Sequence, residues 1–277
     1  MPAFPSSDGF DVAAWDLGGD GPPVLMAHAT GFHGLVWRPM AADLADFHCY
    51  SFDERGHGDS ARPPEHPYDW AGFADDALAV VDGLGLERPF GFGHSAGAAA
   101  LLMAEAFRPG TFRAFYLWEP VVMPFDAPVG PQDNPLSEGA RRRRQVFGSR
   151  DEAYENFASK PPFSMLSADA LRAYVDHGFA DADSGQVRLK CRPADEAQMY
   201  RMGSAHAAFS RFGDVRCPVV LACGAETNAF GPELIELQGA RLPHARTEVF
   251  AGLGHFGPLE DPTTVAAAVR RAFSEPG

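Results

Sequence analysis

The sequence predicts an α/β fold in which a mostly parallel sheet is flanked by helices and interrupted by a helical insertion. Short apolar runs typical of buried strands alternate with helical patterns up to about residue 122, and this rhythm returns from about residue 214. Between them, residues 123–213 hold several prolines and short helical patterns, but no convincing buried strand. We therefore expect a core of residues 1–122 and 214–277, with a helical cap of residues 123–213 inserted into it.

Each half of the core has its own series of expected elements. In the first half, buried strands are expected at 22–29, 47–53, 88–94 and 112–119. The helices between them are expected at about 36–45, 69–86 and 96–107. In the second half, the expected elements are strands at 217–224 and 246–252 and helices at about 232–242 and 258–273. Helices that connect successive strands favour a parallel sheet.

The insertion carries start signals for helices. Ser149 is followed three residues later by Glu152, which is a capping-box pattern, and Ser167 precedes a second helical pattern. Its place in the chain predicts that it lies over the sheet as a cap.

Composition excludes several classes of protein. The chain has 277 residues, of which 45% are hydrophobic, so it can bury a full core. Its net charge of −14 argues against a nucleic-acid partner, since phosphate contacts need a clustered basic surface. The run Arg141 to Arg144 is an exception, which we interpret as a solvated helix face, with an anion site as the alternative.

The cysteines and the hydropathy pattern give the expected environment. Cys49, Cys191, Cys217 and Cys223 lack the spacing of a zinc site or a disulfide framework, so we expect them to be reduced and buried. No apolar run is long enough to span a bilayer, and the first residues lack a basic region followed by an apolar run, so we expect no signal peptide. We therefore expect a cytoplasmic protein without a membrane partner, a metal or an organic cofactor.

The stretch Gly93-His94-Ser95-Ala96-Gly97 follows an expected strand and opens an alanine-rich helix. A serine at the tip of such a turn needs small neighbours, because its backbone is strained and the strand and helix pass close by. The helix N-terminus offers free N–H groups to an anion. This context favours Ser95 as a nucleophile over a serine in an ordinary turn.

Two further segments suit such a nucleophile. His255 lies in a glycine-flanked loop after the last expected strand, where its imidazole would reach the same sheet edge. The segment "HATGF" (28–32) follows the first buried strand, and a backbone N–H there would complete an oxyanion site with that of Ala96. His28 and His94 are expected to be structural, and the turn with Asp53, Arg55, His57 and Asp59 to be a network that fixes a loop.

The motifs "HATGF", "SFDERGHGDS", "GHSAG" and "GLGHFGPLEDP" stand in the order and spacing of the α/β-hydrolase family, which the chain resembles over nearly its whole length. The resemblance implies an α/β-hydrolase fold with a nucleophile at Ser95 and a general base at His255. It also implies an oxyanion hole formed by the amides of Thr30 and Ala96.

The acidic residue that would pair with His255 departs from the common pattern of that family. Many relatives place an aspartate after the strand near 217–223, where this chain has Thr227, which carries no charge. Glu226 lies one residue away and could replace it in a shifted turn. We favour Glu119, at the end of the strand after the nucleophile helix, since it requires no distortion. This placement resembles the zearalenone-type lactone hydrolases over a short stretch.

The expected pocket lies between cap and sheet and is largely apolar. Its candidate wall residues are Phe32, Trp118, Phe125, Phe163 and Met165, although most aromatic residues of the cap are expected to form the cap's own core.

These observations predict a serine hydrolase that cleaves an ester or lactone of a small hydrophobic molecule through an acyl-enzyme. Serine at the nucleophile position argues against dehalogenases and epoxide hydrolases, which use a carboxylate there. The alternatives are a hydrolase of carbon–carbon bonds in diketones and a non-catalytic ligand receptor on the same fold.

Overall fold

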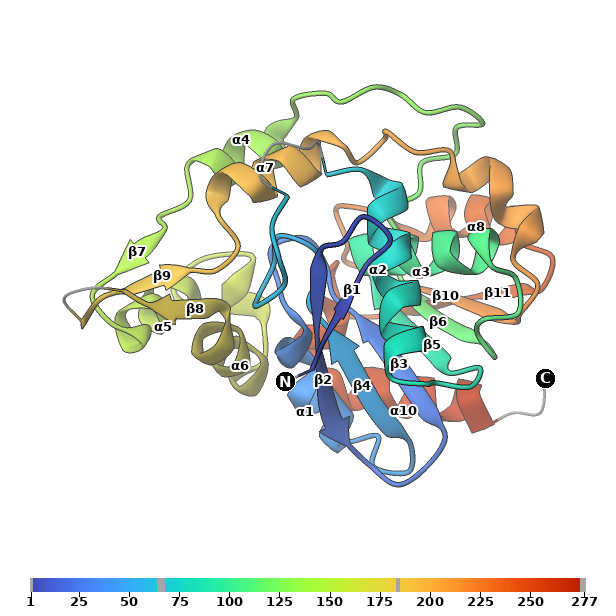
Figure 1. Ribbon diagram of the computed structural model, residues 1–277, viewed down its shortest axis with the longest axis horizontal. Helices are drawn as coiled ribbons and strands as arrows, with labels where there is room; N and C mark the ends of the chain where they lie inside the picture. Colours follow the sequence, from blue (N-terminus) through green and yellow to red (C-terminus); the bar gives the residue numbers. More distant parts are fainter. Residues whose placement is uncertain (1, 64–67, 183–184, 275–277) are drawn as a thin grey trace.

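The computed structural model describes residues 2–63, 68–182 and 185–274, and its central element is an eight-stranded sheet with the order β1-β2-β4-β3-β5-β6-β10-β11 (Figure 1). β1 and β2 run antiparallel, as do β2 and β4, whereas the other neighbouring strands pair in parallel. The strands are β1 (Ala3–Pro5), β2 (Asp11–Gly18), β3 (Pro23–Ala27), β4 (His48–Phe52), β5 (Phe90–His94), β6 (Phe115–Trp118), β10 (Val219–Gly224) and β11 (Ala245–Phe250).

All the strands expected from the sequence form, and the mostly parallel sheet is confirmed. β1 and β2 were not expected. In β2 three successive residues are buried, and the residues after them alternate between partly buried and exposed. The strand therefore lacks the continuous apolar run that marks the parallel strands. β2 closes one side of the parallel strands by pairing with β4.

Helices cover both faces of the sheet. Successive residues of a strand point to opposite faces, so Leu25 packs in one apolar cluster with α2, α3 and α8, while Met26 packs in the other with α1 and α10. The helices of the core are η1 (Gly34–Trp37), α1 (Arg38–Ala42), α2 (Trp70–Gly83), α3 (Ala96–Phe107), α8 (Pro232–Arg241), α9 (Gly257–Glu260) and α10 (Pro262–Ser274).

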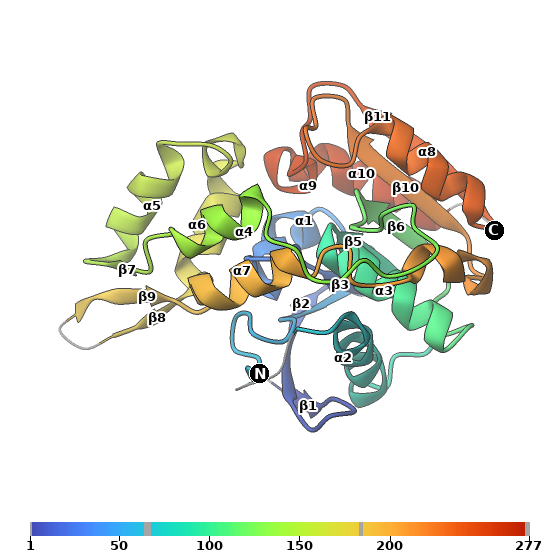
Figure 2. The ribbon, with the colours of Figure 1, turned by 90° about the horizontal axis from the view of Figure 1, so that it is seen from above.

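The inserted segment lies to one side of the sheet and crosses above it (Figure 2). Its elements are α4 (Pro135–Arg141), β7 (Val146–Phe147), α5 (Arg150–Ala158), η2 (Phe163–Met165), α6 (Ala168–Gly178), β8 (Phe179–Asp181), β9 (Val187–Leu189), α7 (Pro193–Arg201) and η4 (Ala208–Asp214). The expected caps are present, because Ser149 accepts the Glu152 N–H and Ser167 accepts the Ala170 N–H.

The insertion, in which the sequence shows no convincing buried strand, contains three short strands that are only partly buried. β7, β9 and β8 form a small antiparallel sheet. These strands have two or three residues each, too few for the period-two pattern to stand out in the sequence.

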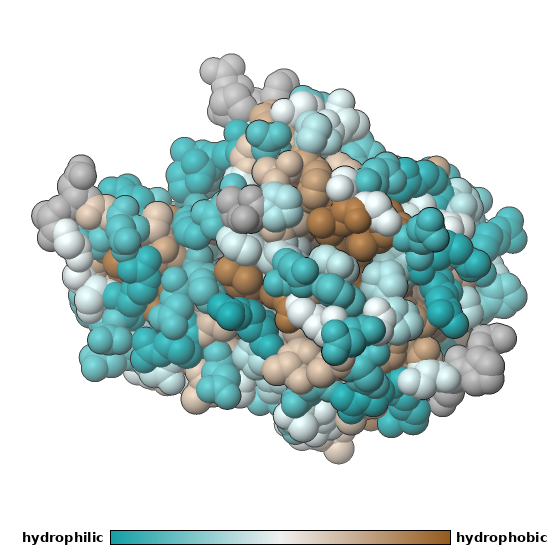
Figure 3. Space-filling model, turned by 60° about the horizontal axis from the view of Figure 1, so that its bottom comes forward, coloured by the Kyte–Doolittle hydropathy of each residue, from teal (hydrophilic) through white to brown (hydrophobic). Residues whose placement is uncertain are grey.

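Polar residues cover most of the face shown in Figure 3, and apolar residues gather there only in small patches. Most large apolar side chains belong instead to the two clusters that enclose the sheet. Within the described ranges, no helix is both long enough and apolar enough to cross a membrane. The four cysteines are buried and free.

Candidate active site

Ser95 occupies a strained turn between β5 and α3. Its backbone φ of 55° lies in the left-handed region, and only 7% of the residue is exposed to solvent. A Cβ on Gly93 would lie 2.6 Å from the Cα of Ala98, and one on Gly97 would lie 2.5 Å from the carbonyl carbon of Ala27. Neither backbone can give way, so this turn requires both glycines.

Glu119 follows β6, the next strand of the sheet, and also adopts a left-handed φ, of 44°. Its side chain is fully buried and accepts several hydrogen bonds. Oε1 accepts the Gly224 N–H at 3.1 Å, and Oε2 accepts the Thr227 hydroxyl at 2.8 Å and the Phe230 N–H at 3.3 Å. These donors satisfy a carboxylate that burial would otherwise leave unsolvated.

His255 completes this arrangement from the loop after β11. Its Nδ1–H donates to Oε2 of Glu119 at 2.6 Å, which leaves Nε2 as the unprotonated nitrogen of the neutral ring. Among the described residues, neither Nε2 of His255 nor Oγ of Ser95 has a hydrogen-bond partner. Glu226 is exposed, and its side chain contacts no partner in the same ranges. Of the two candidate carboxylates, the structure therefore brings Glu119 to His255.

Backbone contacts hold these segments together. The Ser95 N–H donates to the carbonyl of Trp118, the residue before Glu119. Nε2–H of His94 donates to the carbonyl of His255 at 2.9 Å, and the two rings lie 4.9 Å apart. Burial lowers the pKa of His94 well below its ordinary value, so this ring is neutral beside His255. His94 has the structural contact expected of it.

The segment after β3 faces the start of α3. The Gly97 N–H donates to the carbonyl of His28, which ties this segment to the turn that holds Ser95. The amides of Thr30 and Ala96 have no acceptor among the residues that the structure describes. Two free amides beside Ser95 are the donors that an oxyanion needs.

Two buried imidazoles support this segment from behind. Nε2 of His57 accepts the Gly31 N–H at 2.9 Å, and its Nδ1–H donates to the carbonyl of Arg55. Nε2 of His28 accepts the Glu54 N–H at 3.0 Å, and its Nδ1–H donates to the Ala29 carbonyl. Both rings can accept these bonds only while they are neutral.

The neutral state of His57 gives a pH-dependent expectation. Burial lowers its pKa from 6.5 to about 4. Because the folded protein then binds fewer protons than the unfolded chain, the stability from this ring is complete above pH 6.5 and is lost as the pH falls toward 4. We expect the stability difference between the wild type and His57→Gln, measured by urea unfolding from pH 7.5 to 5, to shrink as the pH falls. A stability difference that stays constant over this pH range would contradict the expectation.

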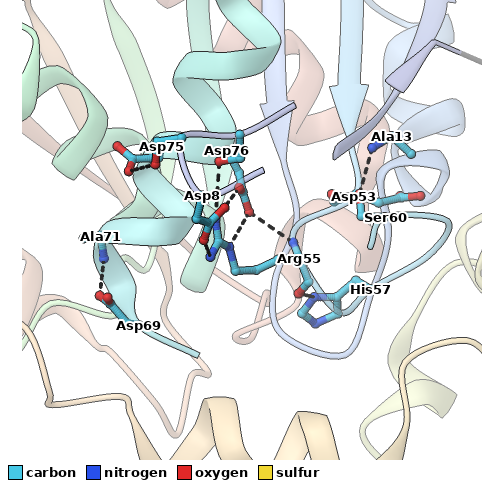
Figure 4. A network of polar contacts seen from close by, with 12 residues as sticks. Asp8, Ala13, Asp53, Arg55, His57, Ser60, Asp69, Ala71, Asp75 and Asp76 are labelled. Atoms are coloured by element: carbon cyan, nitrogen blue, oxygen red, sulfur yellow. Dashed lines mark hydrogen bonds and ion pairs between the residues drawn. The ribbon is translucent and has the colours of Figure 1, made fainter. Parts of the chain in front are cut away.

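The turn after β4 forms the expected loop-fixing network (Figure 4). Asp53 accepts the N–H groups of Gly34 and Asp59. Arg55 points between two carboxylates, as Figure 4 shows, and bonds to Asp76 through Nε and Nη2 at 2.8 and 2.6 Å and to Asp8 through Nη1 at 2.6 Å. This network fixes the turn that carries His57.

His28, Glu54 and His57 also form a buried group whose ligand atoms lie within 4.8 Å of one another, close enough for a metal ion. The lone pair of each Nε2 is already used to accept a backbone N–H. Both carboxyl oxygens of Glu54 are buried without a partner among the described residues, and burial raises the pKa of this group well above its ordinary value. Because both Nε2 lone pairs are occupied and burial disfavours the charged form of Glu54, this group does not suit a metal ion.

The candidate pocket residues separate into two sets. Phe32 is 4% exposed and stacks on Phe163 at 5.8 Å between ring centroids. Phe32 also contacts the ring of Phe256, which lies 5.0 Å from the ring of His255. Phe32 and Phe163 therefore border the site, together with Phe256, which the sequence analysis did not include.

The other three candidates show different degrees of burial. Trp118 is fully buried under the loop of His255, where its ring fills the space that a Cβ on Gly257 would occupy. Phe125 and Met165 are 41% and 51% exposed. For Trp118 the pattern of an aromatic beside Glu119 was misleading, because alternation along β6 points neighbouring side chains to opposite faces.

The arginine run is only partly a solvated face. Arg141 and Arg144 are exposed and pair with Asp133 and Glu152. Arg143 is instead mostly buried, and its guanidinium bonds to Glu196 at 2.5 Å and to the Tyr174 hydroxyl at 2.6 Å.

This buried cap pair touches the segment that carries Thr30. A Cβ on Gly31 would lie 2.8 Å from Oε1 of Glu196 and 3.4 Å from Nη1 of Arg143. Periodicity could not single out Arg143 from its neighbours, because it lies after the end of α4, in the link to β7, where helical spacing no longer applies.

A separate cleft of about 440 Å³ lies between cap and core, lined among others by Arg38, Asp176 and Lys190. None of the residues around Ser95 and His255 lines it. Its charged walls differ from the apolar pocket expected beside Ser95.

Comparison with known proteins agrees with this geometry. The family model described as "Alpha/beta hydrolase family" matches residues 24–268. The chain therefore belongs to the alpha/beta hydrolase family, and the fold predicted from its motifs is confirmed.

Individual relatives span nearly the whole chain. A protein of Caulobacter sp. (strain K31) named as carbamate hydrolase RutD is 38% identical over 261 residues, which cover 91% of this chain and 90% of that protein. The crystal structure of E-2-(acetamidomethylene)succinate hydrolase has a TM-score of 0.82 at 21% identity, with 99% of this chain and 98% of that chain covered. The esterase RhEst1 from Rhodococcus sp. ECU1013 has a TM-score of 0.76 at 20% identity, and the match covers 100% of this chain and 99% of that chain.

Proposed function

We propose that this protein is a serine hydrolase that cleaves a carboxylic ester or lactone of a small hydrophobic molecule through an acyl-enzyme. The observation that carries the proposal is the bond between His255 Nδ1 and Glu119 Oε2, next to a serine in a strained turn. That bond leaves Nε2 of His255 free to take a proton.

In this mechanism Ser95 Oγ attacks the carbonyl carbon while His255 Nε2 accepts the serine proton. The negative charge on the carbonyl oxygen is held by the amides of Thr30 and Ala96. Collapse of the tetrahedral intermediate breaks the bond to the leaving alkoxide, which takes the proton from His255. Water, deprotonated by His255, then attacks the acyl-enzyme. The bond between the acyl carbon and Ser95 Oγ breaks, Oγ takes the proton back from His255, and the acid is released. Glu119 stabilises the imidazolium formed in both steps.

The surroundings of the site support an apolar substrate. Phe32, Phe163 and Phe256 form a continuous group of rings beside His255. Such rings favour an acyl group or ring with little charge.

A second candidate is the cleavage of a carbamate or amide by the same residues. The 38% identity to a protein named as a carbamate hydrolase favours it. Aryl esters and aryl carbamates with the same leaving group, compared by kcat/KM, would distinguish the two substrate classes.

Labelling with a fluorophosphonate tests for an activated nucleophile. We expect one adduct per chain by intact mass, mapped to Ser95, and none on Ser95→Ala. The reagent phosphonylates Ser95 only if His255 activates it. A folded wild-type protein without an adduct would contradict the proposal and favour a non-catalytic ligand receptor.

A further inference from the structure

The position that many relatives use for their acid is occupied here by Thr227, and its hydroxyl contacts the acid that we propose. Thr227 Oγ1 lies 2.8 Å from Oε2 of Glu119. The same oxygen lies 2.6 Å from Nδ1 of His255. Thr227 and His255 are therefore two of the three donors to this carboxylate oxygen, and the third is the more distant Phe230 N–H.

The direction of the Thr227 hydroxyl is fixed. Oγ1 accepts the Ala229 N–H at 3.1 Å, so its own proton is free to point at Glu119. The hydroxyl is thus a donor to a carboxylate within a turn that the backbone holds in place. A hydrogen bond to a charged group is stronger than one between neutral groups.

From these contacts we propose that Thr227 is a positioning residue, which holds the Glu119 carboxylate in the orientation that meets Nδ1 of His255. The inference rests on the proposed function.

Steady-state kinetics test the positioning role. Thr227→Val keeps the shape of the side chain and removes the hydroxyl, so we expect kcat to fall about tenfold with little change in KM. Thr227→Ser keeps the hydroxyl and should restore kcat. Thr263→Val is a matched control, because that hydroxyl also donates to a carboxylate, Asp43 Oδ2 at 2.7 Å, at an exposed site. An unchanged kcat in Thr227→Val overturns the proposal.

The outcomes separate this inference from the proposed function. If the wild type labels at Ser95 and turns over esters, and Thr227→Val behaves like the wild type, the function stands and the role of Thr227 is wrong. If the wild type neither labels nor turns over, the proposed function is wrong. The exchange rate of the His255 Nδ1–H then decides the role of Thr227, since loosening the carboxylate in Thr227→Val should speed exchange with solvent.

Discussion

Glu119→Gln should lower kcat by about 10²- to 10⁴-fold, because the imidazolium that forms on His255 loses its counter-charge. The surrounding donors add to the effect. Gly224 N–H faces Oε1, and Thr227, Phe230 and His255 donate to Oε2, so the amide NH₂ of a glutamine must face at least one of them. The loss should appear in kcat with ester substrates.

Glu226→Gln is the matched control for this prediction. Glu226 lies in the same turn but is exposed, so its variant should keep wild-type kcat. Circular dichroism and urea unfolding would show that both variants are folded. The reverse pattern, with activity lost only in Glu226→Gln, would move the acid to Glu226.

Arg55→Met should reduce the free energy of unfolding by about 3–5 kcal/mol, because it leaves the carboxylate of Asp76 buried without its cation. Arg108→Met is a matched control. Arg108 also binds a carboxylate, Asp82, through two N–H groups, but both side chains are well exposed. Its loss should cost about 0–1 kcal/mol.

The loss of unfolding free energy in Arg55→Met should change with pH in a definite direction. Burial raises the pKa of Asp76 even beside Arg55, and loss of the guanidinium raises it further. Protonation at low pH relieves the unpaired charge, so the cost of Arg55→Met should grow as the pH rises from acid to neutral. Urea unfolding at several pH values measures it. Equal losses of unfolding free energy in Arg55→Met and Arg108→Met would show that the pair of Arg55 with Asp76 is not needed for folding.

The fold could be predicted because the parallel strands are apolar on both faces. The runs that became β3, β5 and β10 stand out in the sequence for that reason. β2 and the short strands of the cap were missed, since half-exposed or very short strands leave no continuous apolar signal.

At the candidate site, the residues singled out from the sequence are those whose backbone context is local. Ser95 sits in a turn that its flanking glycines define, and Glu119 is the last residue before a proline at a strand end. The hydroxyl of Thr227, the buried guanidinium of Arg143 and the ring of Phe256 were not anticipated as site contacts. Their partners come from distant segments, and such pairings leave no local pattern.

The sharing of one carboxylate oxygen by Thr227 and His255 also has a consequence for how sites of this kind diverge. Exchange of the acid between the two strand ends takes two substitutions, and their order matters. If aspartate appears at 227 first, two carboxylates adjoin and repel each other. If Glu119 is lost first, the imidazolium has no counter-charge. The first order keeps an anion beside His255 throughout and is therefore the route along which selection for activity can act.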